Sequence, residues 1–428
     1  MISSPTIKRP TVAARRWVVS QIGARRHYAI PAILERAGLL ERFYTDLCAE
    51  APLVRALEFA LPRSLRPRAV DRLLTRTVSQ VPRQKIQCFP LFALRRILSR
   101  NDGDSMADSY RTWLEANRRF NLHVVRAGFG TGDTVYVFNG AGLEILERAK
   151  QLGLQTVVDQ TDAPVAVEES LLSRERAEWP AWENGTVHRD DWLLMADREK
   201  AEWALADTIV CGSSYVKDAV ETCGGPVRRC KVVPYGFDGA APTTRPVSKP
   251  SGQPLRVLFL GTLCLRKGIQ YFWQTARTLR GGLFQFRAVG PIRLTDQAIQ
   301  QMRGDVELVG TVPRSEVGRQ YEWADVLVLP SVSEGSANVC YEALAHGLPV
   351  VTTDHAGSVV RDGVEGSIVP IRDSEAIAQA LAALSADRDR LAAMSEAALL
   401  RAADFTLEKY AGRLLEALVP ESCQERVH

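Results

Sequence analysis

The C-terminal half of the chain alternates short apolar runs with segments of helical periodicity, and this alternation constrains the fold more than any other feature. Apolar runs stand at 255–261, 285–290, 305–310, 324–331 and 349–353. Between them, helices are predicted at 267–280, near 295–302, near 314–323 and in a short segment that ends at Gly347. Strands buried on both faces give continuous apolar runs, and parallel strands need helical crossovers. The pattern therefore predicts a doubly wound parallel α/β domain with helices on both faces.

The N-terminal half repeats the alternation less regularly. Strands are predicted at 15–20, 42–46, 134–138, 154–158, 207–213 and 230–236, with helices at 143–151 and 191–206. Residues 238–254 are rich in Pro, Ser and Thr, which is typical of a linker. We therefore expect two facing Rossmann-like domains with a cleft between them, at 1–245 and 255–400. A C-terminal helix is expected over 401–428, for which a return to the N-terminal domain is one alternative.

The length and the cysteine pattern set broad limits on the class of protein. A chain of 428 residues is long for a single hydrophobic core, so two domains are the natural expectation. Its eight cysteines form no C-x-x-C pair and share no metal-ligand spacing with the six histidines, which favours free thiols and no metal site. No apolar run approaches the ~18 residues of a membrane-spanning helix. With no recognisable secretory signal, we expect a cytoplasmic protein.

The basic charge is concentrated in residues 51–100. This segment has eleven Lys or Arg residues against two acidic ones, a charge of +9 in a chain whose net charge is +4. It is predicted to be part of a basic helical insertion of the N-terminal domain, at about 51–120. Apolar residues interleaved with arginines suit peripheral contact with the anionic inner face of a membrane. The alternative is a helical subdomain with a solvated basic face; no nucleic-acid-binding module is recognisable.

Two charged groups follow predicted strands of the C-terminal half. The stretch "FLGTLCLRKGIQYF" carries Arg266 and Lys267 just before a helix, and "LPSVSEGSANVCYEALAHGLPVVTTD" carries Glu334 and Glu342. Cations at a helix N-terminus suit a diphosphate, and carboxylates accept hydrogen bonds from sugar hydroxyls. Each group alone is as well explained by a solvated turn or a surface charge. Their joint occurrence predicts a sugar-nucleotide site.

The stretch "EGSANVCYEALAHGLPVVTTDHAGSVVRDGVEGSIVP" resembles the E-x7-E signature of the family 4 (group 1) retaining glycosyltransferases, which have the GT-B fold. The resemblance covers residues 256–370, extends to "LADTIVCGSSYVKDAV" and "KVVPYGFD", and is looser near the N-terminus. It implies a metal-independent hexosyltransferase without a cofactor. The enzyme would move a hexosyl unit, with retention, from a UDP- or GDP-sugar to a glycan or lipid-linked acceptor in polysaccharide or glycoconjugate biosynthesis.

The resemblance assigns roles to individual residues. Glu342 would hold the nucleotide ribose and Glu334 the donor sugar, while Lys267, with Arg266 beside it, would neutralise the diphosphate. The remaining donor-binding positions are Gly335, Ser336, Ala337 and Asn338 near the sugar and phosphates, Gly310, Thr311 and Val312 near the base, Gly23 in the first strand–helix loop, and Thr262.

Three departures from the family pattern affect these assignments. Thr262 stands where members often have an arginine, which Arg266 would replace, and "GSA" replaces the usual Gly-Phe-Gly. The usual N-domain histidine is absent, so Asp159, Gln160 and Asp162 are the candidates near the anomeric carbon. Asp162 is equally well explained as an Asx-type cap.

Other interpretations stay open beside this one. His27 and Tyr28, together with Gln160, would line the acceptor side, or the first two would belong to a solvated loop. Two other functions also stay open, and the altered positions favour the second of them. These are a sugar-nucleotide epimerase or hydrolase on the same fold, and a binding protein that does not turn its ligand over.

Overall fold

The computed structural model describes residues 15–51, 54–55, 59, 74, 76–78, 80–98, 106–184, 189–237 and 252–419 of the 428. Much of the predicted basic insertion, chiefly residues 60–73 and 99–105, lies outside the described residues. The predicted linker at 238–254 also lies almost wholly outside them.

The chain forms two compact units. The first contains residues 1–159, 187–209 and 416–428, and the second contains residues 160–186 and 210–415. Residues 160–186 therefore group with the second unit although they precede the linker in the sequence. The chain crosses from one unit to the other four times.

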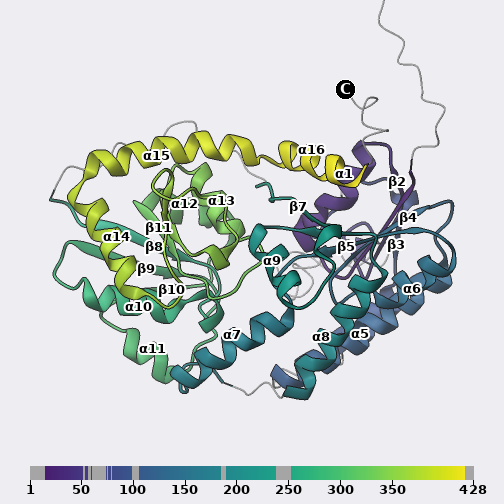
Figure 1. The fold of residues 1–428 in the computed structure, drawn as a ribbon, viewed down its shortest axis with the longest axis horizontal. Helices are drawn as coiled ribbons and strands as arrows, with labels where there is room; N and C mark the ends of the chain where they lie inside the picture. The colour runs from purple at the N-terminus through teal and green to yellow at the C-terminus, as the bar shows by residue number, and fades with distance from the viewer. Residues whose placement is uncertain are drawn as a thin grey trace, which may run out of the picture. The chain divides into compact units, whose positions relative to one another are not determined.

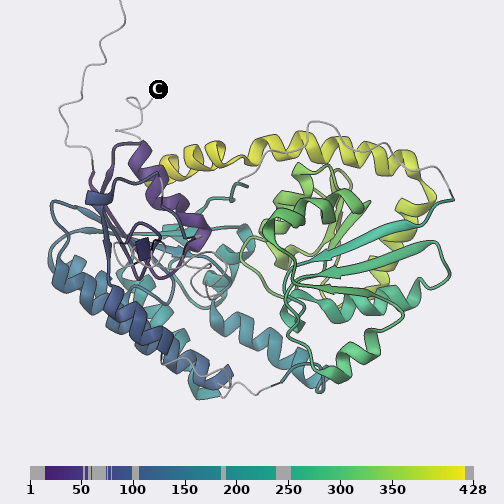
Figure 2. The same cartoon turned by 180° about the vertical axis from the view of Figure 1, so that it is seen from behind.

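A seven-stranded sheet has the order β3-β2-β1-β4-β5-β6-β7, with parallel pairing from β3 through to β5. Its strands are β1 (Trp17–Gln21), β2 (Leu40–Thr45), β3 (Ile86–Cys88), β4 (Thr134–Phe138), β5 (Gln155–Gln160), β6 (Thr208–Cys211) and β7 (Cys230–Val232). The helices of the first unit are α1 (Ala29–Arg36), α4 (Pro90–Leu98), α5 (Met106–Ala127), α6 (Leu143–Gln151) and α8 (Arg189–Leu205). Helices α5, α6 and α8 pack side by side (Figures 1 and 2).

A six-stranded sheet in the second unit has the order β10-β9-β8-β11-β12-β13, and every pairing in it is parallel. Its strands are β8 (Leu255–Leu260), β9 (Phe284–Val289), β10 (Glu307–Gly310), β11 (Val326–Leu329), β12 (Val350–Thr352) and β13 (Gly366–Ile368). The longer helices of the unit are α7 (Val165–Glu178), α9 (Ser214–Thr222), α10 (Ile269–Thr278), α11 (Asp296–Met302), α12 (Arg314–Trp323), α13 (Asn338–Ala345), α14 (Ser374–Ala386), α15 (Arg388–Ala402) and most of α16 (Leu407–Leu418).

Helices cover both faces of the six-stranded sheet. Helix α10 packs against α14 on one side, and α13 packs against α15 on the other (Figures 1 and 2). The central strand β11 is buried along its whole length, as expected of a strand covered on both faces. This arrangement confirms the predicted doubly wound parallel α/β architecture. The strands β3 and β13 were not predicted.

None of the helices in the described part of the chain is long and apolar enough to cross a membrane.

Gly268 fixes the turn between β8 and α10. Its φ is +77°, which disfavours a residue with a side chain. A Cβ at this position would lie 1.9 Å from the carbonyl oxygen of Pro330, just after β11. The loops that follow two neighbouring strands therefore touch at a glycine, and this contact sets the position of the two cations that precede it.

We expect Gly268→Ala to lower the free energy of unfolding by more than the ~1–2 kcal/mol that a left-handed backbone costs an L-residue. The surplus arises because the Cβ also pushes the β8 loop away from Pro330. Urea titration monitored by circular dichroism measures the effect. Gly282→Ala is the matched control, since φ is +89° there and no atom lies within 4 Å of a Cβ. Equal losses in the two variants would contradict the steric argument.

Candidate active site

The candidate site begins with two loops at the carboxyl ends of β8 and β11, which are neighbours in the sheet. The first loop contains a short 3-10 helix, η5 (Leu265–Lys267), and the second leads from Pro330 to α13. The backbone N–H of Val332 donates a hydrogen bond of 2.9 Å to the carbonyl oxygen of Arg266. The cations of the first loop are thereby held next to the glutamate of the second.

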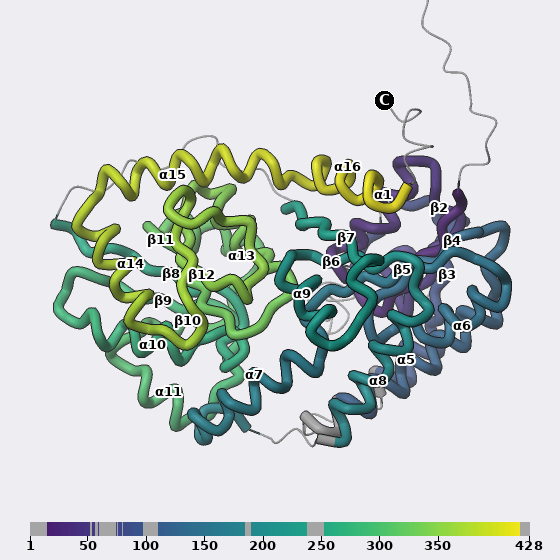
Figure 3. The backbone as a smooth tube through the Cα atoms, in the orientation of Figure 1, coloured from purple at the N-terminus to yellow at the C-terminus, as the bar shows by residue number. Residues whose placement is uncertain are grey.

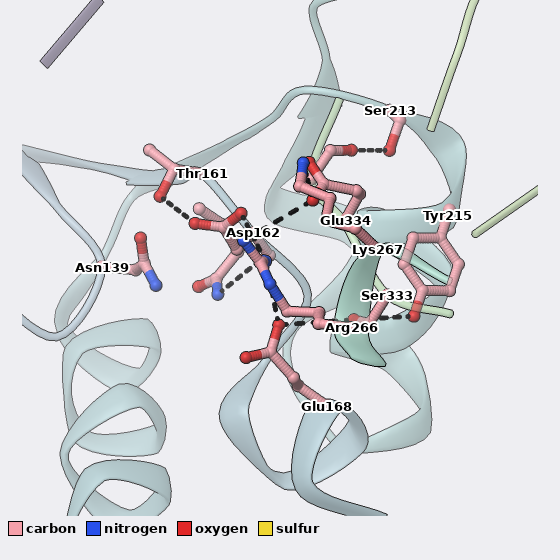
Figure 4. A network of polar contacts seen from close by, with 12 residues as sticks. Asn139, Thr161, Asp162, Glu168, Ser213, Tyr215, Arg266, Lys267, Ser333 and Glu334 are labelled. Atoms are coloured by element: carbon pink, nitrogen blue, oxygen red, sulfur yellow. Dashed lines mark hydrogen bonds and ion pairs between the residues drawn. The ribbon is translucent and has the colours of Figure 1, made fainter. Parts of the chain in front are cut away.

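Lys267, Arg266 and Glu334 form an ion-pair cluster across these loops. Nζ of Lys267 contacts Oε1 of Glu334, and Nη2 of Arg266 lies 3.5 Å from the same oxygen. The side chain of Glu334 is only 8% exposed, so the two cations stabilise a carboxylate that water barely reaches. Figure 4 shows both cations directed toward this carboxylate.

Arg266 contacts two further carboxylates from the segment that follows β5. Its Nη1 lies 3.3 Å from Oε2 of Glu168 and 3.7 Å from Oδ1 of Asp162 (Figure 4). Burial alone would lower the pKa of the Arg266 guanidinium, but Glu334, Glu168 and Asp162 raise this pKa well above its usual value. The arginine therefore stays charged and links three acidic groups.

Glu168 has the most strongly perturbed carboxyl group of the cluster. Its side chain is 18% exposed, and burial raises its pKa to about 7. Arg266 lowers this pKa, whereas Asp162, Glu334 and Glu169 raise it further by charge repulsion. A carboxyl group of this kind changes its protonation near neutral pH.

Helix α7, which carries Glu168, is anchored in the second unit by Glu175. The buried carboxylate of Glu175 accepts hydrogen bonds from Arg372 Nε at 2.6 Å, Tyr271 OH at 2.7 Å and Gln270 Nε2 at 2.8 Å. Trp182, beyond the end of the helix, lies in the hydrophobic core of the same unit. In Figure 3 the tube of α7 runs toward α11, and the backbone N–H of Thr295 donates to the carbonyl oxygen of Trp182 at 2.9 Å. These contacts fix the position of Glu168.

The loop around Gly335 is tightly packed. Ser213 Oγ donates a hydrogen bond of 2.5 Å to the carbonyl oxygen of Gly335, and a Cβ on Gly335 would lie 1.7 Å from the carbonyl oxygen of Thr161. Ser336 Oγ donates to the carbonyl oxygen of Gly357 at 3.0 Å and shares a hydrogen bond of 2.6 Å with Tyr341 OH. The "GSA" segment that departs from the family pattern is thus held by its own set of partners.

A second group of side chains, His355, Tyr215 and Ser333, contacts the loop that carries Glu334. His355 Nδ1 forms a hydrogen bond of 2.8 Å with the carbonyl oxygen of Val332, and its ring stacks on Tyr215 at 4.4 Å. Tyr215 OH donates to Ser333 Oγ at 3.4 Å, and Ser333 Oγ lies 3.5 Å from Oε2 of Glu168 (Figure 4). Ser333 therefore connects the glutamate loop to α7.

Glu342 occupies a separate position on α13. Its Oε2 accepts a hydrogen bond of 2.7 Å from Tyr321 OH on α12. Burial and the Glu342 carboxylate raise the pKa of the Tyr321 phenol well above its usual value, so the phenol stays a donor. The ring of His346 stacks on Tyr321, and its Nδ1 forms a hydrogen bond with the carbonyl oxygen of Glu342. The side chain of Glu342 is therefore held in one orientation.

The structure brings Arg266, Lys267, Glu334 and Asp162 into one network, and Glu342 lies on the helix that follows. The remaining predicted residues of the second unit lie in loops or at element ends: Thr262 after β8, Gly310 at the end of β10 with Thr311 and Val312 following, Gly335, Ser336 and Ala337 before α13, Asn338 at its start, and Gln160 at the end of β5. Gln160 is buried, and its Nε2 donates to the carbonyl oxygen of Asp162 at 3.1 Å.

The predicted residues of the first unit form a left-handed turn after β1. Arg26, His27 and Tyr28 all have positive φ, an unusual run for residues with side chains. The N–H of Gly23 donates to Asp46 Oδ1 at 2.9 Å, and Tyr28 is buried whereas His27 is exposed. Asp159 is fully buried and accepts hydrogen bonds from Arg26 at 2.8 Å and Tyr136 at 2.5 Å. The carboxylate of Asp159 is thus engaged inside the first unit.

Sequence reasoning missed Glu168, Ser213, Tyr215 and His355. Each is separated from its partner by tens of residues or more; Glu168 and Arg266 are 98 positions apart. The signal available for Glu168 was the pair of adjacent glutamates, Glu168 and Glu169, in the first turn of a helix that follows a predicted strand. Among the residues that the structure describes, no three His, Cys, Asp or Glu side chains are grouped as a metal site.

Comparisons with known proteins agree with this geometry. Residues 254–387 match the family model of the glycosyl transferases group 1. The chain is 35% identical over 189 residues to the putative colanic acid biosynthesis glycosyltransferase WcaL of Escherichia coli K12, covering 40% of this chain and 46% of the relative. It is 34% identical over 148 residues to the amylovoran biosynthesis glycosyltransferase AmsK of Erwinia amylovora, covering 31% and 36%. The matched region spans less than half the length of either relative.

The fold also matches a solved structure along most of the chain. The structure of Anabaena Alr3699/HepE in complex with UDP has a TM-score of 0.61 at 16% identity, covering 94% of this chain and 99% of that one. The same protein has been solved with UDP-glucose, with a TM-score of 0.60. At this identity the likeness concerns the fold alone.

These findings define the class of protein: the fold is that of the GT-B glycosyltransferases. Residues 254–387, which carry Arg266, Lys267, Glu334 and Glu342, are the part of the chain that matches the group 1 glycosyl transferases.

We expect Glu175→Ala to lower the free energy of unfolding by about 3 kcal/mol, because it leaves Arg372 buried without its carboxylate partner and removes acceptors from Gln270 and Tyr271. Urea titration measures the change. Glu178→Ala on the same helix removes an exposed ion pair with Arg174 and should change stability by less than about 0.5 kcal/mol. A similar effect of both substitutions would contradict the anchoring role.

Proposed function

We propose that the chain is a retaining glycosyltransferase that moves a hexosyl unit from a UDP- or GDP-sugar to a glycan or lipid-linked acceptor in polysaccharide or glycoconjugate biosynthesis. The observation that carries the proposal is the cluster of Arg266, Lys267 and Glu334 at the carboxyl ends of β8 and β11. Ligands of doubly wound sheets bind at these strand ends.

The electrostatics of the cluster support transfer from a diphosphate. The leaving diphosphate gains negative charge as the glycosidic bond breaks, and stabilising this charge is the main electrostatic task of the site. Arg266 and Lys267 are held by their loop just before the N-terminus of α10, where the helix dipole also favours an anion. In this proposal the two cations and the dipole supply the charge without a metal ion.

The carboxylates suit the sugar groups of such a donor. When the cations turn toward the diphosphate, Glu334 is free to accept hydrogen bonds from the hydroxyls of the donor sugar. Glu342, oriented by Tyr321, accepts from the nucleotide ribose in the same scheme. Gly335, Ser336, Ala337 and Asn338 offer backbone N–H groups at the start of α13. The candidate groups on the acceptor side are His27, Tyr28 and Gln160, with Asp162 beside Arg266.

We also propose that helix α4 contacts an anionic membrane surface, as a lipid-linked acceptor would require. The helix buries Phe92 and Ala93 but exposes Leu91 and Leu94 next to Arg95. Exposed apolar residues beside basic ones suit the interface of an anionic bilayer. The remaining basic charge of residues 51–100 adds to this attraction.

The function is tested by following donor consumption with and without acceptor. Thermal shifts with UDP, GDP, ADP and their hexose conjugates, in EDTA, first select the donor; a site occupied at a hundredfold excess adds ~2.7 kcal/mol of stability. Donor consumption that requires a glycan or lipid-linked acceptor and continues in EDTA is the expected result. Consumption without acceptor would indicate a hydrolase or epimerase, and binding without consumption would indicate a binding protein.

We expect Glu342→Ala to weaken donor binding at least tenfold, the equivalent of about 1.4 kcal/mol, because a hydrogen bond to a charged group is lost. Isothermal titration calorimetry measures the affinity. Glu316→Ala, an exposed glutamate on α12, is the control and should bind as the wild type does. Unchanged affinity in Glu342→Ala would remove the ribose assignment.

Membrane contact is tested by co-sedimentation with vesicles. We expect binding to vesicles of phosphatidylcholine with phosphatidylglycerol and little binding to phosphatidylcholine alone, since the attraction needs anionic lipid. Leu91→Asp should reduce binding several-fold. Leu400→Asp on α15 is the matched control, because both leucines are 76% exposed. Equal binding by the two variants would contradict a role for α4.

A further inference from the structure

The polar network around Arg266 contains more negative than positive charge. Asp162, Glu168 and Glu334 surround Arg266, and within the described part of the chain Lys267 forms an ion pair with Glu334 alone of the three. A donor diphosphate would bring further negative charge to the same two cations. Binding therefore needs either the departure of a carboxylate or the loss of its charge.

Glu168 is the carboxylate least able to leave. Helix α7 is anchored through Glu175 and Trp182 in the second unit, so the backbone at Glu168 is fixed. Asp162, by contrast, lies in a loop with about half of its side chain exposed, where water can stabilise its charge. Glu334 contacts Lys267 in the free protein, and in the proposed complex it accepts hydrogen bonds from the hydroxyls of the donor sugar.

The charged groups that face Glu168 come from four segments. They are Arg266 on η5, Glu334 on the loop after β11, Asp162 on the loop after β5, and Glu169 on α7 itself. Tyr215, linked through Ser333, also interacts with it. Among these groups the positive charge comes from Arg266, so a turn of Arg266 toward a diphosphate leaves Glu168 among acidic neighbours in a poorly solvated position.

We propose that Glu168 is a positioning residue of the donor site: it holds Arg266 in the free protein, and it takes up one proton from solvent when a diphosphate draws Arg266 away. The proton moves from water or buffer to an oxygen of the Glu168 carboxyl, and no covalent bond to the donor forms or breaks in this step. This inference rests on the proposed function, because the diphosphate belongs to the proposed donor.

The direction of the pH dependence follows from the sign of the shift. In the free protein the pKa of Glu168 is raised to about 7 by burial, and the loss of Arg266 raises this pKa further in the complex. Below pH 7 the carboxyl already carries its proton, so binding takes up little. Above pH 7 binding requires proton uptake, and affinity falls by up to about tenfold per pH unit.

The test is isothermal titration calorimetry of the full-length protein with UDP-glucose at about pH 8, in phosphate and in Tris. The diphosphate of UDP-glucose is esterified at both ends, so it lacks the terminal phosphate group that ionises near pH 6. Proton uptake by the ligand therefore does not add to proton uptake by the protein. The observed heat should depend on the ionisation heat of the buffer with a slope of about one proton. In Glu168→Gln the slope should be zero, and affinity should no longer fall between pH 7 and 8.

Glu178→Gln removes one carboxylate from the exposed side of the same helix and should keep the slope of the wild type. A purely structural role for Glu168 would alter affinity without altering the slope. Two results would overturn the inference and leave the proposed function intact. One is a wild-type binding heat that does not depend on the buffer, and the other is an unchanged slope in Glu168→Gln.

A second measurement needs no ligand and separates the two proposals. In protein labelled with ¹³C at glutamate carboxyl groups, a resonance that titrates near pH 7 in the wild type should disappear in Glu168→Gln, whereas that of Glu202, whose pKa burial raises to about 8, should remain. In Arg266→Gln the midpoint of the Glu168 resonance should move upward. A Glu168 midpoint near the ordinary value of about 4.3 would overturn the inference on its own. Absence of binding to UDP-, GDP- and ADP-glucose would instead count against the proposed function and the proton uptake that depends on it.

Discussion

The candidate site depends on one shared guanidinium. Poorly solvated carboxylates are unfavourable unless a cation stands beside them, and Arg266 contacts two of them, Glu168 and Glu334, as well as the half-exposed Asp162. Because these carboxylates come from two segments that are distant from Arg266 in the sequence, the arginine links three parts of the second unit. The three carboxylates raise the pKa of Arg266, which means that they stabilise the positive charge of its guanidinium.

The rest of the second unit supports that interaction in layers. The parallel pairing of β8 and β11 places the two loops side by side, and Gly268 lets them touch at Pro330. Glu175 holds α7 against α10, and Ser213 holds the loop at Gly335. The contacts of Glu175 and Ser213 are buried hydrogen bonds with their partners in place, and such contacts favour one arrangement of the loops around the site.

The sequence predicted what is encoded locally. The buried strands of the second unit are continuous apolar runs, and the pairs Arg266–Lys267 and Glu334–Glu342 are each contained in a single strand–loop–helix unit. The sequence did not reveal the contact between Glu168 and Arg266, because nothing in either segment specifies a partner 98 residues away. The left-handed turn at Arg26, His27 and Tyr28 was equally hidden, since no glycine marks it and the surrounding fold imposes it.

The membership of residues 160–186 in the second unit has a consequence for chimeric proteins. The obvious place to join the halves of two related chains is the stretch at 238–254. A junction there would take Glu168 and Glu175 from one parent and Arg266, Gln270 and Arg372 from the other. Natural recombination at this point would meet the same mismatch. The residues that form these contacts are therefore encoded on opposite sides of the junction although they belong to one network.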